Sequence, residues 1–361
     1  MDKRITSAPM ATPPLLDQLL RTPGPSGHET GPAAVWRDSV SAFSDDVRVD
    51  GIGSSSVRVP GTADGPSMAV IGHIDEIGIH VTHIDEDGYL HFGEVGGWDP
   101  FQLIGQRVRL ATRGGDVLGV IGRKPIHLLD QDERGKAPKI KDLHLDIGAV
   151  DGDAARAAVR IGDVGVIDAE PVTLLGDRVA SRSFDNRIGA WVAAEVARQV
   201  AESGGSPGDV YGLAVVQEET SLSGARTSAF SLDFDIAVIV DVTHATDQPG
   251  VTLGPVTKHA LGSGPVITRG TIVHPVVTEL LIDTADELGM GYTVESAGRA
   301  TGTDGDAVHN SRAGIATAIV SVPLRYMHSS VELVDLTDVE ATAKLISAFA
   351  QKLTPGLSLA R

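Results

Sequence analysis

The sequence predicts an α/β protein in which a small all-β domain interrupts a larger domain of alternating helices and strands. The run 68–72 is entirely apolar, which is typical of a strand buried on both faces of a helix-flanked sheet. From about residue 78 to 171, short strand patterns alternate with glycine turns and no long helix pattern interrupts them. Beyond residue 172, helical and strand patterns alternate again, so the larger domain resumes there.

The length of 361 residues favours one large domain plus a smaller one. We expect residues 1–77 and 172–361 to form the two parts of a three-layer α/β domain. Residues 78–171 are expected to form an inserted, barrel-like β domain. The 42 glycines fit a fold that contains many turns.

Individual elements follow from local patterns. Helices are expected at 15–20 and from the capping residues 26–29 through residue 40, with another at 188–201. A final helix is expected after a capping box formed by Thr337 and Glu340. Strands of the larger domain are expected at 68–72, 210–216, 236–240 and 316–322, and strands of the insertion at 79–84, 89–92, 107–112 and 117–121.

Charge and composition limit the function. The formal charge of −18 repels phosphate backbones and anionic membranes, so neither nucleic acid nor a membrane is an expected partner. No segment approaches the roughly 18 consecutive apolar residues of a membrane helix, and prolines interrupt the first 20 residues where a signal peptide needs an apolar run. The absence of cysteine fits a cytoplasmic protein and restricts any metal site to His, Asp and Glu ligands.

Candidate site residues recur just after apolar strands or just before a helix. His73, Asp185, Glu219 and Asp241 all occupy such positions. Because ligands in open α/β sheets bind beyond the carboxyl ends of the strands, we expect these side chains to converge. Singly, each also fits a commoner role as a helix cap, a first-turn acid or a surface turn.

Two short motifs add chemistry. In an extended segment His73 and Asp75 point to the same side, so the carboxylate can orient a histidine that ligates a metal. The adjacent acids Glu218 and Glu219 would repel each other unless a cation is nearby, and one could bind metal while the other transfers protons. The simpler interpretations are a histidine at a strand end and an acidic surface turn.

His328 follows the predicted strand 316–322 and completes a set of two imidazoles and several carboxylates. Such a set suits zinc, cobalt or manganese at a hydrolytic site. The sequence contains no His-Glu-x-x-His helix, no Gly-x-Ser-x-Gly elbow and no phosphate-binding glycine loop. Single-zinc proteases and serine hydrolases are therefore disfavoured.

Five motifs in this order resemble those of the M42 metallo-aminopeptidases, which include the tetrahedral TET peptidases. The motifs are Gly72-His-Ile-Asp-Glu-Ile-Gly78, Ser183-Phe-Asp-Asn-Arg-Ile-Gly189, Gln217-Glu-Glu219, Asp241-Val-Thr243 and Arg325-Tyr-Met-His-Ser329. The resemblance extends into the insertion through Gly96-Gly-Trp-Asp-Pro100. One departure is Thr301-Gly-Thr-Asp304, where the family pattern has two glycines before Thr-Asp.

The resemblance implies an aminopeptidase that removes N-terminal residues from peptides with a free N-terminus, using two divalent ions. It implies that Asp185 bridges the ions, that His73 and Asp241 complete one site, and that Glu219 and His328 complete the other. Glu218 would be the general base and Asp75 would orient His73. The implied assembly is a hollow homododecamer built from dimers.

Alternative functions on the same scaffold are a carboxypeptidase, a deacylase or a glucanase, since family members have carried glucanase labels. A structural or binding homologue without activity would require damaged ligand positions. All five ligand positions and the base are intact, which favours an enzyme.

Overall fold

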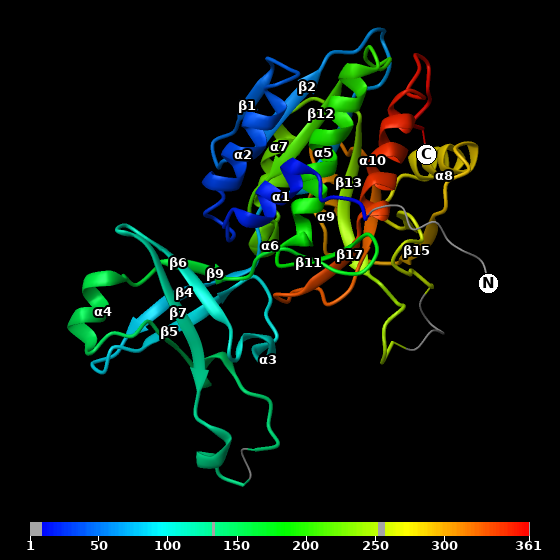
Figure 1. Cartoon of the computed structure of the whole chain (residues 1–361). Helices are drawn as coiled ribbons and strands as arrows, with labels where there is room; N and C mark the ends of the chain where they lie inside the picture. The colour runs from blue at the N-terminus through cyan, green and yellow to red at the C-terminus, as the bar shows by residue number, and fades with distance from the viewer. Residues whose placement is uncertain (1–8, 132–133, 252–256, 361) are drawn as a thin grey trace.

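The computed structural model describes residues 9–131, 134–251 and 257–360, which form a large helix-covered sheet and a smaller β-barrel (Figure 1). The chain leaves the large sheet after β3 (Met68–His73) and enters the barrel at β4 (Gly78–Ile84). It returns after β9 (Val164–Ile167) through β10 (Val172–Thr173) and β11 (Arg178–Ser181). The predicted fold class, a three-layer α/β arrangement with a barrel-like β insertion, is confirmed.

The large sheet has eight strands in the order β1-β2-β12-β3-β13-β16-β14-β15. Its centre is parallel, because β3 pairs in parallel with β12 and β13, and β13 pairs in parallel with β16. The carboxyl ends of four strands therefore meet at one edge of the sheet. The other strands of this sheet are β1 (Val47–Val49), β2 (Ser55–Val59), β12 (Val210–Val215), β13 (Ile236–His244), β14 (Val266–Gly270), β15 (Thr293–Ala297) and β16 (Ala316–Leu324).

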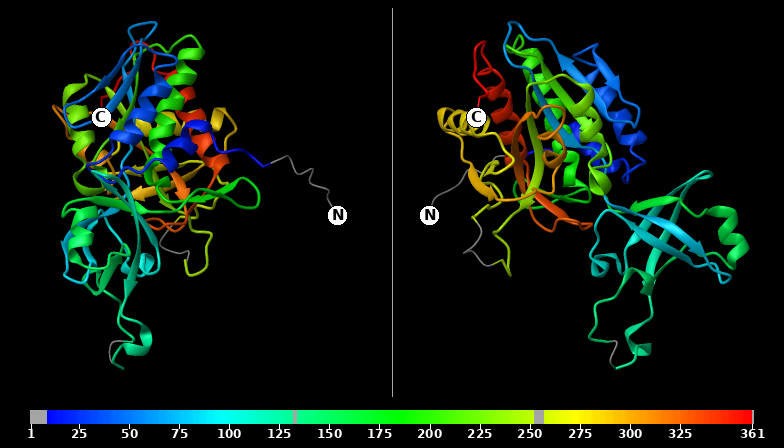
Figure 2. Two further views of the ribbon diagram at one scale, coloured as in Figure 1. Left: turned by 60° about the vertical axis from the view of Figure 1, so that its left-hand side comes forward. Right: turned by 180° about the vertical axis from the view of Figure 1, so that it is seen from behind.

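Helices cover both faces of the large sheet (Figures 1 and 2). One face packs against α1 (Pro14–Arg21), α2 (Thr30–Val40), α5 (Phe184–Glu202), α8 (Pro275–Glu287) and α10 (Leu336–Ala350). The other face packs against α7 (Ser223–Ser231) and α9 (Gly305–Val308). Every residue of β3 is buried, as expected for a strand between two helical layers.

Helix α5 crosses β3 at very short range. A Cβ atom on Gly72 would lie 2.1 Å from the carbonyl carbon of Gly189, so only a glycine permits this approach. Next to the crossing, the fully buried Arg187 forms an ion pair of 3.1 Å with Glu76, which also pairs with Arg182. These contacts fix the segments that begin at His73 and Asp185, two candidate metal ligands, against each other.

The barrel closes in the order β4-β5-β8-β7-β6-β9 around its own apolar core. Its remaining strands are β5 (Leu90–Val95), β6 (Arg107–Thr112), β7 (Gly115–Arg123) and β8 (Leu143–Asp146). Short helices decorate it: α3 (Pro100–Leu103), α4 (Gly152–Ala158) and the 3₁₀ turns η1 (Ile126–Leu128) and η2 (Ile140–Asp142). A separate three-stranded sheet, β10-β11-β17 with β17 (Glu332–Asp335), lies next to the carboxyl edge of the large sheet.

One local prediction is wrong, and one predicted strand is longer than expected. The last helix has no Thr337–Glu340 capping box, because Asp335 is its N-cap and accepts a hydrogen bond from the Thr337 N–H. The predicted strand 236–240 continues to His244, since β13 pairs with β16 from Ile236 through His244. Asp241 therefore lies within a strand and not just beyond its end.

Among the residues that the structure describes, no helix is long and apolar enough to cross a membrane.

Candidate active site

The sequence-predicted site residues converge at the carboxyl edge of the large sheet. His73 is the last residue of β3, Asp241 lies in β13, and Asp185 lies in the first turn of α5. Glu219 lies in α6 (Glu218–Ser221), which follows β12, and His328 lies in the loop after β16. All five, together with Glu218, line one pocket of about 630 Å³.

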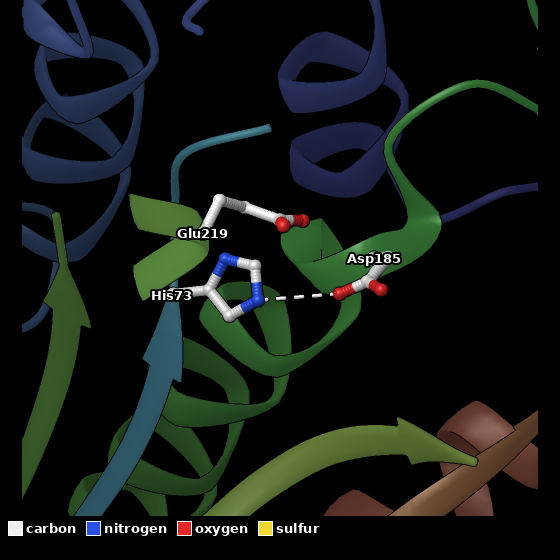
Figure 3. A group of neighbouring side chains, drawn as sticks. All are labelled: His73, Asp185 and Glu219. Carbon is white, nitrogen blue, oxygen red and sulfur yellow. Dashed lines mark ion pairs between the residues drawn. The ribbon is translucent and has the colours of Figure 1, made fainter. Parts of the chain in front are cut away.

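Asp185 occupies the centre of this group. Its Oδ1 lies 3.2 Å from His73 Nε2, and its Oδ2 lies 3.4 Å from His328 Nε2. Figure 3 shows the Asp185 carboxylate and the His73 ring facing each other, with Glu219 reaching toward the same space. Each oxygen of one carboxylate thus faces a different histidine.

The two glutamates of the doublet face different histidines. Glu218 Oε2 lies 3.7 Å from His73 Nε2, and Glu219 Oε1 lies 3.7 Å from His328 Nε2. Their side chains are only 10% and 6% exposed, which excludes the interpretation of the doublet as an acidic surface turn. The two carboxylates therefore belong to the pocket.

Two sets of three potential ligand atoms lie within 4.8 Å of one another: His73, Asp185 and Glu219, and His73, Glu218 and Asp241. These sets divide the residues differently from the pairs that the family resemblance implies. His73 belongs to both because its Nε2 lies between Asp185 and Glu218. The side chains of this pocket are thus already close enough to share a cation.

Buried negative charge dominates the electrostatics. Burial, reinforced by the charges of Asp304 and Asp185, raises the pKa of Glu218 to about 8. Burial and the Asp185 charge likewise raise the pKa values of Glu219 and Asp241 well above their ordinary values. Like charges at this density ionise together only when a cation compensates them, so the residues fit divalent metal ions.

The pKa values of His73 and Asp185 each shift in the direction that favours the charged form of the side chain. Burial would lower the pKa of His73, but the charge of Glu218 and contacts with Asp185 and Asp75 raise it well above its ordinary value. For Asp185, burial acts to raise the pKa, and the contacts with His328 and His73 outweigh it and lower the pKa. Asp185 is therefore the carboxylate of the cluster that stays ionised most readily.

Asp75 connects the segment of His73 with the segment of Glu218 and Glu219. It is fully buried, and its two oxygens accept hydrogen bonds from the Glu218 N–H at 3.0 Å and the Glu219 N–H at 3.2 Å. Its Oδ1 also lies 3.3 Å from His73 Nδ1, an ion-pair contact without hydrogen-bond geometry. One carboxylate thus connects β3 with α6.

The sequence interpretation missed two buried acids. Asp304 is 1% exposed, its Oδ1 has no hydrogen-bond partner among the described residues, and burial raises its pKa to about 8. Glu332 is 2% exposed and contacts the backbone of two site residues. Asp304 ends the Thr301-Gly-Thr-Asp304 motif, which was a usable signal, whereas nothing in the sequence around Glu332 distinguishes it from an ordinary strand residue.

Among its described residues, the remaining pocket wall contains no Asp, Glu, Lys or Arg. It is formed by Thr220, Ser221, Leu222, Val242, Thr243, His244, Thr301, Gly302, Thr303, Met327 and Gly97. Some of its hydroxyl groups are already engaged, as Thr243 Oγ1 donates to Glu295 Oε2 at 2.9 Å. The wall therefore has polar groups but no dedicated partner for an ionic side chain.

A buried set of imidazoles and carboxylates beyond the carboxyl ends of parallel strands fits a metal-dependent hydrolase. The chain belongs to the M42 glutamyl aminopeptidase family, whose model matches residues 53–345. The predicted family and the predicted enzyme class are both confirmed.

Individual relatives match nearly the whole chain. A lysyl aminopeptidase of Pyrococcus furiosus is 36% identical over 345 residues, which cover 94% of this chain and 97% of the relative. The crystal structure of a TET aminopeptidase from the marine sediment archaeon Thaumarchaeota archaeon SCGC AB-539-E09 has a TM-score of 0.89 at 34% identity, covering 94% of this chain and 96% of that one. The TET1 peptidase of Pyrococcus horikoshii, described as assembling into a tetrahedron or a large octahedral shell, has a TM-score of 0.81 at 30% identity, covering 93% and 98%.

Proposed function

We propose that the protein is a dinuclear-metal aminopeptidase in which Asp185 bridges two divalent ions. His73 and Asp241 would complete one site, and Glu219 and His328 the other. The observation that carries this proposal is the position of Asp185, whose two oxygens lie 3.2 and 3.4 Å from the Nε2 atoms of the two histidines. The donor set of imidazoles and carboxylates suits zinc or cobalt, with manganese as a third candidate.

When bound, two such ions supply Lewis acidity toward a carbonyl oxygen and toward water. Glu218 is the proposed general base. Burial raises the pKa of Glu218 to about 8, and a general base is most effective when its pKa lies near the working pH. Asp75 fixes its position by accepting the Glu218 N–H hydrogen bond.

The proposed substrates are peptides with a free N-terminus. The carboxylates of the pocket offer partners for a cationic α-amine, whereas an acetylated terminus would present no charge to them. Release of N-terminal residues from free peptides, with none from their N-acetylated counterparts, would separate this activity from that of a deacylase or a carboxypeptidase. A panel of aminoacyl substrates would then identify the preferred first residue.

The two roles within the glutamate doublet can be separated by comparing Glu218→Gln with Glu219→Gln. Glu218→Gln keeps the size of the side chain but removes the proton acceptor, a loss of about 10²–10⁴-fold in kcat. Its metal content should equal that of the wild type, measured by elemental analysis after dialysis. Glu219→Gln should lose metal and regain part of its activity when excess cation is added.

The opposite pattern, in which Glu218→Gln loses metal and recovers with added cation, would exchange the two roles. If both variants kept wild-type activity, the catalytic proposal itself would be wrong.

We also propose that residues 78–171 form a separate domain that contributes to a cytoplasmic, tetrahedral homododecamer built from dimers. The large assemblies described for the TET1 peptidase support this proposal. So do the apolar side chains that the barrel presents to solvent, among them Leu118 at 57%, Leu128 at 66% and Val150 at 87% exposure. Replacing residues 78–171 with a short linker should yield a particle with fewer copies of the chain, obtained by dividing its light-scattering mass by the mass of the shortened chain. An unchanged number of copies would contradict the role of the barrel.

A further inference from the structure

Asp185 and His328 lie on irregular backbone. Asp185 has φ −77° and ψ 104°, which are not helical values, although it lies in the first turn of α5. His328 has φ +57° and Tyr326 has φ +62°, a left-handed conformation that is unfavourable for residues with a Cβ atom. Regular secondary structure therefore does not hold either proposed metal ligand, Asp185 or His328, in place, and the backbone N–H group of each needs another hydrogen-bond partner.

Glu332 supplies an anchor to both. Its Oε2 accepts a hydrogen bond from the Asp185 N–H at 3.0 Å, and its Oε1 accepts one from the His328 N–H at 2.9 Å. The side chain is 2% exposed, so water does not compete for these bonds. One carboxylate thereby sets the spacing between the two backbone segments.

The surrounding sheet holds Glu332 itself in place. It is the first residue of β17 and pairs with Ser181, the last residue of β11, only a few residues before Asp185. Directly after it, Leu333 exchanges two backbone hydrogen bonds of 3.0 Å with Arg325, which precedes the turn that carries His328. Glu332 thus lies where the segments that carry Asp185 and His328 both leave regular secondary structure.

We propose that Glu332 is a positioning residue that fixes the distance between Asp185 and His328 and thereby preorganises the metal pocket. The proposal rests on the metal site proposed above. Asp75 makes a related contact in the same pocket, where its two oxygens accept the N–H groups of the consecutive residues Glu218 and Glu219. Two buried carboxylates therefore support the pocket: Glu332 joins the segments of Asp185 and His328, and Asp75 joins the end of β3 to the first turn of α6.

Asp338 provides a matched control. It is 1% exposed and also accepts two backbone hydrogen bonds, from Gly262 and Gly264 at 2.7 Å each, but these residues carry no proposed ligand. Both Glu332→Gln and Asp338→Asn replace one acceptor oxygen with an amide N–H₂ that opposes a backbone donor. Any general cost of that replacement is therefore common to both variants.

The test measures metal binding directly. Metal-free wild type, Glu332→Gln and Asp338→Asn are titrated with Co²⁺, and the visible absorption of the ion reports both affinity and coordination geometry. Glu332→Gln should bind about 10–100-fold more weakly and show an altered spectrum, the effect typical of losing a partner that orients a ligand. Saturating Co²⁺ should restore much of its kcat with little change in KM.

Asp338→Asn should keep the wild-type affinity and spectrum even if it unfolds at a lower denaturant concentration. The proposal is overturned if Glu332→Gln matches the wild type in affinity and spectrum, or if Asp338→Asn weakens binding equally. Should Glu332→Gln fail to fold, Glu332→Asp replaces it, since one methylene less cannot reach both N–H groups and the same weakening is expected. Failure of the wild type itself to bind Co²⁺ would instead refute the proposed metal site.

Discussion

Replacing Gly72 with alanine tests how closely the metal pocket depends on the crossing of β3 and α5. The new Cβ would lie 2.1 Å from the Gly189 carbonyl carbon and 2.5 Å from the Ala190 nitrogen. Ordinary contacts begin at 3.4 Å, and the obstructing atoms are backbone that cannot rotate away. The strand and the helix would have to separate by more than an ångström.

The expected magnitudes follow from this geometry. Overpacking of a tight core typically costs about 1–3 kcal/mol, and the clash with backbone on both sides places Gly72→Ala at about 3 kcal/mol or more in the free energy of unfolding. Because His73 follows Gly72 directly and Asp185 begins the same helix as Gly189, the separation also moves two site residues apart. A displacement of about 1 Å can cost about 10²-fold in rate, so kcat/KM should fall by that order.

Urea denaturation, elemental analysis and kinetics on the same preparation measure these effects. Gly51→Ala is the control, since a Cβ there meets nothing within 4 Å and should leave stability unchanged or slightly improved. If Gly72→Ala unfolded within about 0.5 kcal/mol of the wild type, the range of an inconsequential surface substitution, then the close crossing would not constrain the fold as argued.

Two further predictions concern buried charge. Arg187→Met should lower the free energy of unfolding by about 3–5 kcal/mol, because it breaks the fully buried pair with Glu76. The control Arg198→Met, on the exposed face of α5, should cost less than about 1 kcal/mol. Equal costs in denaturation would contradict the burial argument. Folding raises the pKa of Glu218 from its ordinary value of 4.5 to about 8, so metal-free protein should lose stability as pH rises from 4.5 to about 8 and change little above that. Its melting temperature should therefore be lower at pH 9 than at pH 6. Saturating zinc should remove this dependence, since it binds the deprotonated form, and a metal-free melting temperature that rises with pH would refute the assignment.

The convergence of the site was predictable from sequence because it depends on topology. His73 and the Glu218–Glu219 doublet follow strands that pair in parallel, so their ends must meet at one edge of the sheet. Asp241 was found for the same reason, although its strand is longer than the apolar run indicates. The five family motifs supplied the rest of the set.

Glu332 was not predictable in the same way, although Asp75 was. Glu332 matters because two segments far apart in sequence turn their N–H groups toward it, and no local pattern records that. The last helix shows a related limit: Asp335 and Thr337 are both good caps, and the choice between them depends on where β17 ends. Sequence patterns identify which residues can cap a helix or accept a hydrogen bond. Which of them do so depends on the course of the irregular backbone.

The chain enters and leaves the barrel at neighbouring points. Its first and last strands, β4 and β9, pair directly, with Ile79 opposite Gly165 and His80 opposite Val164. The barrel is therefore a closed insertion in the chain between His73 and Asp185. Length and sequence can vary in the parts of the barrel that do not contact the pocket, whereas Gly97 must keep its place because its carbonyl oxygen lies 2.8 Å from His328 Nδ1.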